Sequence, residues 1–190
     1  MKIYFTASLR GKKEFGKNYE LIVKALSGLT DKVFSDHILK NDFSLIESQV
    51  KGEAQKSYVR LLTEIKKADV FVAEVSAQSL SVGHELTEAM ALNKPVIILY
   101  QDDSRRPGLL FGSMYDKMQI LEYTEGNLKS LLAKAVAEAM KHVDVRFNFF
   151  VSPKILSYLD WVAKQRMIPR SVFLRDLIEK EMKKDKAFKG

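Results

Sequence analysis

Residues 68–86, ADVFVAEVSAQSLSVGHEL, decide the fold that this sequence predicts. An apolar run that opens at Asp69 has the character of a strand buried in a parallel sheet, and a loop with Ser79 and Ser81 leads to Glu85 in the first turn of the next helix. Strand carboxyl ends and helix amino ends form the crevice in which open α/β sheets bind ligands, and the helix dipole favours a phosphate there. Both acids are therefore expected near one sheet edge. Position alone does not make them catalytic, because acids also favour helix amino ends for electrostatic reasons.

The composition limits the kinds of protein and site that fit. A chain of 190 residues holds one domain, or one domain with a small appendage. No apolar run reaches membrane-spanning length and the first residues lack a signal-peptide layout, so a soluble cytoplasmic protein without membrane contact is expected. The absence of Cys excludes disulfides, thiolate nucleophiles and Cys-based zinc sites, and the three His are scattered. We therefore expect no metal and no cofactor.

The formal charge of +7 is spread unevenly along the chain. Residues 142–190 hold 11 Lys and Arg against 6 Asp and Glu, a net +5, whereas the remainder holds 20 against 18, a net +2. This asymmetry suggests an appended basic element that meets an acidic partner, most simply nucleic acid. A solvated basic face explains the same numbers.

Short apolar runs alternate with amphipathic stretches through the first 141 residues. Strands are expected at 2–5, 32–34, 69–73, 95–100 and 118–121, and helices at 18–29, 46–67, 82–92 and 126–141. Such alternation predicts an α/β domain, with a parallel sheet flanked by helices on both faces.

The pattern changes after residue 142. Residues 145–151 alternate with period two, and Pro153 stands where a first helical turn accepts proline. One helix to about residue 166 and a second from Ser171 follow. The side chains expected to point inward from these helices are Ile155, Leu159, Val162, Leu174, Leu177, Ile178 and Met182. One strand and two short helices cannot bury such a face alone, so a homodimer is expected.

Five motifs of the first 141 residues resemble a known family. They are YFTASLRG at 4–11, FSDH at 34–37, the strand 68–75, SLSVGHEL at 79–86 and NKP at 93–95. In this order they closely resemble the nucleoside 2-deoxyribosyltransferase superfamily, and most of all its 2'-deoxynucleoside 5'-phosphate N-hydrolases. The resemblance implies a flavodoxin-like (Rossmann-like) catalytic domain over residues 1–141.

The same resemblance implies a chemistry and a set of site residues. Glu85 holds the position of the family's nucleophile, which forms a covalent ribosyl-enzyme, as one carboxylate does in retaining glycosidases. Asp69 matches the second acid, which helps the departing base, and Tyr4 matches a tyrosine beside the nucleophile. The residues that resemble the first-strand loop and the phosphate cradle are Ser8, Arg10, Gly11, Ser79, Ser81 and Gly83. His37 and His84 are candidates for contacts to the base or sugar.

Three positions depart from that family's pattern. Ser81 stands where the hydrolases have Gly, and His84 stands where they have Tyr. A Ser that reaches across from a neighbouring subunit is replaced near Pro107, where Arg105 or Arg106 is the substitute donor to consider, beside the alternative of a solvated basic loop.

Residues 143–190 resemble a second family, the ribbon-helix-helix DNA-binding proteins. The resemblance lies in VRFNFFVSP at 145–153 and RSVFLRD at 170–176. In that family two strands pair across a dimer and their outward side chains enter the major groove. Arg146, Asn148 and Phe150 occupy those positions here; Arg and Asn read base edges, but Phe cannot hydrogen-bond to a base. A dimerisation module and a DNA-binding module both remain open.

The leading functional hypothesis is a hydrolase that cleaves the N-glycosidic bond of a (deoxy)nucleoside 5'-monophosphate and releases free base and sugar 5-phosphate. A nucleoside deoxyribosyltransferase is the close alternative. A DNA-binding regulator that senses a nucleotide without turning it over is the alternative from a different class, and it does not need Glu85. A nicotinamide-dinucleotide hydrolase is a weaker alternative, since no site for a second nucleotide half is evident.

Overall fold

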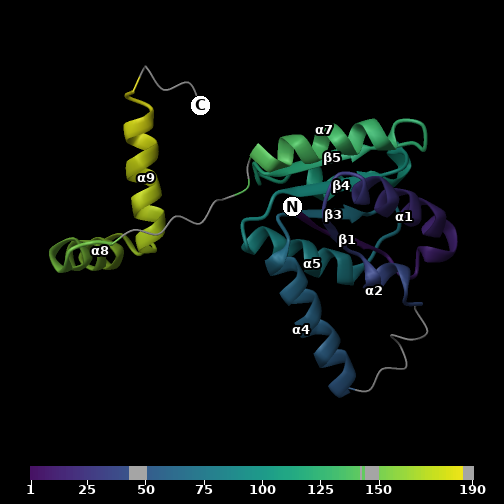
Figure 1. Ribbon diagram of the computed structural model, residues 1–190, viewed down its shortest axis with the longest axis horizontal. Coiled ribbons are helices and arrows are strands. Elements are labelled where there is room, and N and C mark those ends of the chain that lie inside the picture. The colour runs from purple at the N-terminus through teal and green to yellow at the C-terminus, as the bar shows by residue number, and fades with distance from the viewer. Residues whose placement is uncertain (43–50, 142, 144–149, 186–190) are drawn as a thin grey trace. The chain divides into compact units, whose positions relative to one another are not determined.

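The computed structural model describes residues 1–42, 51–141, 143 and 150–185. It divides into two compact units, Met1–Asp144 and Val145–Gly190, shown in Figure 1. The first unit contains a five-stranded sheet with the order β2-β1-β3-β4-β5, in which every neighbouring pair is parallel. The strands are β1 Lys2–Ala7, β2 Lys32–Phe34, β3 Val70–Glu74, β4 Val96–Tyr100 and β5 Met118–Glu122. This is the strand order of the flavodoxin-like fold.

Helices cover both faces of the sheet, as the sequence predicts (Figure 1). The helices of this unit are α1 Lys12–Ser27, α2 Asp36–Leu39, α4 Lys51–Lys67, α5 Leu80–Ala91, the 3₁₀ turn η1 Asp103–Arg105, α6 Gly108–Phe111 and α7 Leu128–Lys141. Helix α1 begins at Lys12 rather than at residue 18, because Phe15, about one turn before Tyr19, extends its buried stripe toward the amino end. The expected start of α4, residues 46–50, lies outside the described residues. No helix in the described part of the chain combines the length and apolarity that a membrane crossing requires.

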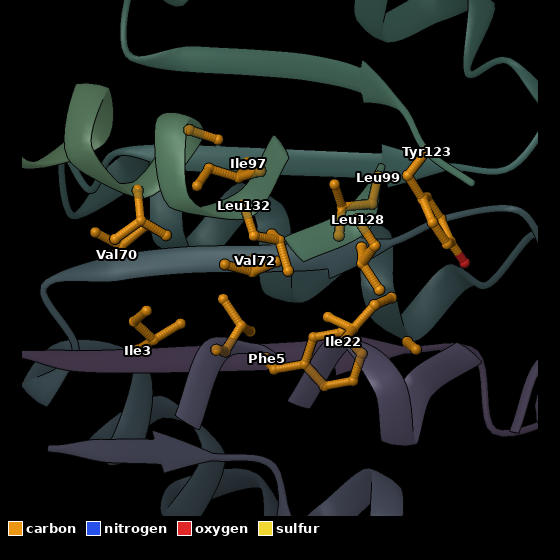
Figure 2. Close-up of a cluster of buried hydrophobic side chains, with 14 of the residues drawn as sticks. Ile3, Phe5, Ile22, Val70, Val72, Ile97, Leu99, Tyr123, Leu128 and Leu132 are labelled. Carbon is orange, nitrogen blue, oxygen red and sulfur yellow. The ribbon is translucent and has the colours of Figure 1, made fainter. Parts of the chain in front are cut away.

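The period-two pattern of the strands divides the core into two layers. Ile3 and Phe5 of β1 point to one face, where Val72, Ile97 and Leu99 join them against α1 and α7 (Figure 2). The residues between them point to the opposite face. There Tyr4, Phe71, Ala73 and Ile98 pack against α4 and α5. Tyr4 and every second residue of β1 therefore face the helix that carries Glu85.

The second unit contains α8 Pro153–Arg166 and α9 Arg170–Met182. Ser152 caps α8, and its Oγ accepts a hydrogen bond from the Ile155 N–H at 3.4 Å. The buried apolar cluster of this second unit consists of Leu159, Val162 and Phe173, with Leu174 partly buried beside them.

Part of the expected inward face is exposed in this unit. The burial of this face was expected only with a partner copy, and that stays a prediction. In a single chain, Ile155, Leu177, Ile178 and Met182 are 46–59% exposed. The physical reason is that two helices of this length have too little surface to cover all of these side chains. The expected strand at 145–151 falls mostly outside the described residues, and so do Arg146 and Asn148.

Candidate active site

A cavity of about 980 Å³ opens at the carboxyl end of β1. Its walls come from the loop after β1, from α2, from one side of α4 and from the first turns of α5. This is the edge of the sheet at which α/β folds bind ligands. The cavity brings together seven of the residues that the sequence singles out, namely Ser8, Arg10, His37, Ser79, Ser81, His84 and Glu85.

Glu85 reaches the cavity from the second turn of α5, not the first. The helix begins at Leu80 because Ser79 is its N-cap: Ser79 has extended backbone, and its Oγ accepts a hydrogen bond from the Val82 N–H at 3.4 Å. Glu85 is 8% exposed. A carboxyl group that is almost covered and yet lines a cavity is available to a bound molecule and shielded from bulk water.

The Tyr4 hydroxyl joins Glu85 to His37. It donates to Glu85 Oε2 at 2.8 Å and lies 3.1 Å from His37 Nε2. The phenol has one proton, so the second contact requires His37 Nε2–H to donate to the Tyr4 oxygen. This leaves His37 Nδ1 without a proton, and among the described residues that buried atom has no hydrogen-bond partner. The Tyr4 ring is fixed between His37 and Phe71, with ring centroids 5.0 and 5.5 Å away.

Burial controls the charges of these three groups. It raises the pKa of Glu85, and the hydroxyls of Thr6 and Tyr4 together with His84 lower that pKa in part. Burial and then the Arg60 guanidinium lower the pKa of His37 to about 4, so the imidazole is neutral near pH 7. His37 Nε2 and Glu85 Oε2 are 3.9 Å apart, but a neutral imidazole makes this a dipolar contact rather than an ion pair. Burial and the Glu85 carboxylate raise the pKa of Tyr4, which therefore keeps its proton.

Hydroxyl groups gather where the loop after β1 meets the start of α5. Ser8 is almost fully buried, and its Oγ accepts the Gly11 N–H at 3.2 Å, which leaves its own proton free to be donated. Ser79 and Ser81 line the same part of the cavity, and Arg10 adds a guanidinium. The first turn of α5 also presents backbone N–H groups. Hydroxyls, amides and one guanidinium together suit an anionic oxygen ligand.

Two glycines of the expected cradle are not among the residues that line the cavity. A Cβ at Gly11 would lie 2.4 Å from the Ala77 Cβ and 2.9 Å from the Tyr19 hydroxyl, so this glycine lets the loops after β1 and β3 pack together. Gly83 lies within α5, where a Cβ would meet open space. The expectation that both contact a phosphate stays a prediction.

Asp69 lies at the opposite edge of the sheet from Glu85. It precedes β3, its carboxylate accepts the Lys2 N–H at 2.7 Å, and its own N–H donates to the Lys2 carbonyl at 2.8 Å. The expectation that both acids share one edge is therefore wrong. A residue that opens a parallel strand lies at the amino edge, whereas a residue after the strand lies at the carboxyl edge.

The cavity contains charged and aromatic side chains that sequence reasoning missed. Asp36, the second residue after β2, lines it together with Lys40, and the Lys40 ammonium holds the pKa of Asp36 below its usual range. The rule that places sites after strand carboxyl ends identifies Asp36, but no local signal identifies Tyr58 of α4. The Tyr58 hydroxyl lies 3.1 Å from His84 Nε2 and the two rings stack at 5.7 Å. This pair ties α4 to α5 beside the cavity.

The two arginines near Pro107 have other contacts in this chain. Arg105 donates to Glu14 Oε1 at 2.7 Å and lies over the Phe15 ring. Arg106 lies 3.7 Å from the centroid of the Phe111 ring. Neither is among the described residues that line the cavity.

A buried carboxylate lies at the carboxyl end of β3 and does not line the cavity. Glu74 is the last residue of β3, and its Oε1 accepts the Ser76 N–H at 3.2 Å, the Ser76 hydroxyl and the Tyr123 hydroxyl at 3.3 Å. Its role is to hold the loop after β3. Among the described residues, no group of three His, Cys, Asp or Glu side chains is arranged to hold a metal ion.

The chain is similar in sequence to nucleotide hydrolases. It is 33% identical to the 5-hydroxymethyl-dUMP N-hydrolase of Rattus norvegicus over 136 residues, which cover 68% of this chain and 81% of that protein. It is 32% identical to the Homo sapiens protein of the same name over 136 residues, with 68% and 76% covered. No protein-family model matches the chain.

A solved structure supports the fold. The CMP N-glycosidase of Clostridium botulinum superposes with a TM-score of 0.52 at 18% sequence identity, over 70% of this chain and 99% of that one. At this level of identity the likeness concerns the fold alone.

Proposed function

The chain belongs to the 5-hydroxymethyl-dUMP N-hydrolase family, and on that premise we propose that it hydrolyses the N-glycosidic bond of a (deoxy)nucleoside 5'-monophosphate. The products are the free base and the sugar 5-phosphate. The observation that carries the proposal is the Glu85 carboxyl group, buried at the wall of a cavity and fixed by the Tyr4 hydroxyl at 2.8 Å. The hydroxyls of Ser8, Ser79 and Ser81 line the same cavity.

The proposed reaction has two steps. The ionised Glu85 carboxylate attacks the anomeric carbon, the carbon–nitrogen bond breaks, and the base leaves with the bonding pair and takes up a proton from water. Water then adds to the anomeric carbon and releases Glu85 from the ester. Tyr4 orients the carboxylate, and His37 fixes the direction of the Tyr4 proton. Asp69 takes no part in this scheme, since its carboxylate binds the Lys2 amide at the other edge of the sheet.

The phosphate is proposed to bind where Ser8, Arg10, Ser79 and Ser81 meet the amino end of α5. A hydrogen bond to a charged group is worth about 1.5–3 kcal/mol, so this set should favour monophosphates over nucleosides strongly. Equal rates on a nucleoside and its monophosphate would argue against this assignment and favour the deoxyribosyltransferase alternative.

The decisive experiment is a screen of nucleoside 5'-monophosphates for release of free base and sugar phosphate. Glu85→Gln should abolish release and keep nucleotide binding, because an amide has the same shape without the nucleophilic charge. Glu88→Gln is the matched control, since Glu88 lies in the same helix with its side chain 35% exposed and pairs with His84. Turnover near the wild-type rate in Glu85→Gln would remove Glu85 from the mechanism, and the sensor hypothesis predicts no release by any variant.

We propose that residues 143–190 form a second domain, a ribbon-helix-helix-like module that makes a homodimer, beside a catalytic domain over residues 1–141. The support is the set of apolar side chains that α8 and α9 leave exposed around a small core, namely Ile155, Tyr158, Trp161, Leu177 and Ile178. Trp161 is the single tryptophan of the chain and is 58% exposed here. In a dimer that covers it, its emission should shift to shorter wavelength as protein concentration rises. Emission that is independent of concentration, with a monomeric mass, would contradict the dimer.

DNA binding is a second role that we propose to test for this module. It depends on the excess of Lys and Arg in residues 142–190, and on Arg146 and Asn148 for any reading of base edges. If the module neutralises several phosphates, affinity for generic duplex DNA should fall steeply as salt rises. A gel-shift titration at two salt concentrations tests this, and no binding at low salt leaves dimerisation as the role of the module.

A further inference from the structure

Thr6 carries a hydroxyl that the fold itself does not use. It lies in β1 two residues after Tyr4 and pairs in register with Ala73 of β3, on the face of the sheet that packs against α4 and α5. Its side chain is fully buried. Its Oγ1 is one of three buried side-chain polar atoms in the described residues that have no hydrogen-bond partner.

A buried hydroxyl without a partner is unfavourable, and the fold has a simple alternative. Valine has nearly the same shape, favours strands equally and has no polar atom to satisfy. The neighbours of Thr6 in the three central strands are mostly apolar, as Phe71, Ala73 and Ile98 show. Packing alone therefore does not account for a threonine here.

The group that the Thr6 hydroxyl does influence is Glu85. It lowers the pKa of Glu85 against the larger effect of burial, as the Tyr4 hydroxyl also does. Tyr4 and Thr6 point to the same face because they are two residues apart in one strand, and Tyr4 already occupies Oε2 of the carboxylate. A hydroxyl proton rotates toward the strongest acceptor near it, and active-site hydrogen bonds are often poorly aligned until a substrate is bound. Because Thr6 Oγ1 has no other partner among the described residues, its hydroxyl is free to turn toward that carboxylate.

We propose that Thr6 is a positioning residue for Glu85, and that its hydroxyl and the Tyr4 hydroxyl together hold the carboxylate ionised and aimed at the sugar. The inference rests on the proposed function, in which Glu85 is the nucleophile. It assigns to β1 a second functional side chain on the same face of the strand. Thr6 does not itself need to touch the substrate.

The test compares Thr6→Val, which keeps the shape and removes the hydroxyl, with Thr6→Ser, which keeps the hydroxyl. Loss of a donor disfavours the ionised carboxylate, so in Thr6→Val the acid limb of the kcat/KM profile should move to higher pH. At a fixed pH on that limb kcat/KM should fall about tenfold, the lower bound for a hydrogen bond to a charged group. Thr6→Ser should restore the wild-type limb. If Thr6→Val does not fold, Thr6→Ala takes its place in the same comparison.

A second readout does not depend on turnover. The infrared carboxyl band that is present in the wild type and absent in Glu85→Gln reports the titration of this one group. Its midpoint should rise in Thr6→Val and stay in place in Thr6→Ser. A structural role for Thr6 would change the melting temperature and leave this midpoint unmoved.

The outcomes separate the inference from the proposed function. If the wild type releases no base, or if Glu85→Gln turns over normally, the proposed function fails. If the wild type is active and Glu85→Gln is inactive, but the pH profile and carboxyl midpoint of Thr6→Val coincide with those of the wild type, the Thr6 inference alone is refuted.

Discussion

Replacing Tyr4 by Phe isolates the contribution of one hydroxyl to the charge of Glu85. The Tyr4 hydroxyl donates to Glu85 Oε2 at 2.8 Å, and the ring stays fixed by stacking on His37 and Phe71 when the hydroxyl is removed. A hydrogen bond to a charged group is worth about 1.5–3 kcal/mol, and 1.36 kcal/mol corresponds to one pKa unit. The pKa of Glu85 should therefore rise by about one to two units beyond the value that burial already gives it.

The assay is the pH dependence of kcat/KM for base release. In Tyr4→Phe the acid limb should move up by the same one to two units, so at a fixed pH on the limb the rate should fall by roughly 10- to 100-fold. On the plateau the effect should be smaller, because a carboxylate that has lost a donor is a stronger base. The acid limb moves to higher pH because the active form of Glu85 is the ionised carboxylate, and the Tyr4 hydroxyl stabilises that ionised form.

Tyr123→Phe is the matched control for this experiment. Tyr123 is almost fully buried and its hydroxyl lies 3.3 Å from a carboxylate oxygen, but that carboxylate belongs to Glu74, outside the cavity. The control should lose stability and keep the wild-type pH profile. If Tyr4→Phe also keeps the wild-type profile, the hydrogen bond does not set the ionisation of Glu85 and the reasoning is refuted.

Three further predictions concern stability. Burial raises the pKa of Glu85 in the folded protein, so stability should fall as pH rises from the ordinary pKa of 4.5 through the higher pKa of the folded state. Glu85→Gln should therefore unfold at a higher urea concentration than the wild type at pH 7. The difference between their urea midpoints should close below pH 4.5. The pKa of His37 is lowered from 6.5 to about 4, so stability should be lost as pH falls through that window, by at most about 3.4 kcal/mol. His37→Gln should flatten this dependence of stability on pH, and an unchanged slope in that variant would contradict the prediction. Met167 ends α8 in a left-handed conformation with φ 50°, so Met167→Gly should stabilise the second unit by up to about 1 kcal/mol, seen as a higher midpoint of Trp161 fluorescence; a lower midpoint would show that the Met167 side chain makes a stabilising contact.

Sequence periodicity predicted the sheet well, because the central strands β3 and β4 are largely apolar runs, as a parallel sheet covered on both faces requires. The five expected strands overlap the observed ones, and 32–34 matches β2 at both ends. Helix starts were less accurate. The first turn of α1 carries Lys12, Lys13 and Glu14, which have no apolar signature, and α5 begins where Ser79 caps it.

The site was predictable where it follows the order of elements and unpredictable where it depends on three-dimensional contacts. Ser79 and Glu85 come after a strand carboxyl end and were found by that rule, whereas Asp69 comes before the strand and was placed at the wrong edge. The pairing of Tyr4 with Glu85 spans 81 positions, and its identification depended on a family resemblance rather than on spacing. Thr6 was missed because a threonine in a strand is ordinary; only its full burial without a standard hydrogen bond draws attention to it.

The chemistry of the cavity depends on a balance at Glu85 between burial and hydroxyl donors. Burial favours the protonated carboxyl group, which cannot attack, while full hydration favours an ionised but weakly nucleophilic one. In the proposed complex, a phosphate near Ser79 and Ser81 would exclude further water and add negative charge, and both effects would raise the pKa of Glu85 again. The donors that oppose this rise must therefore be built into the strand, where substrate cannot displace them. Tyr4 and Thr6 of β1 meet that requirement, since both are fully buried and lie on the face toward α5.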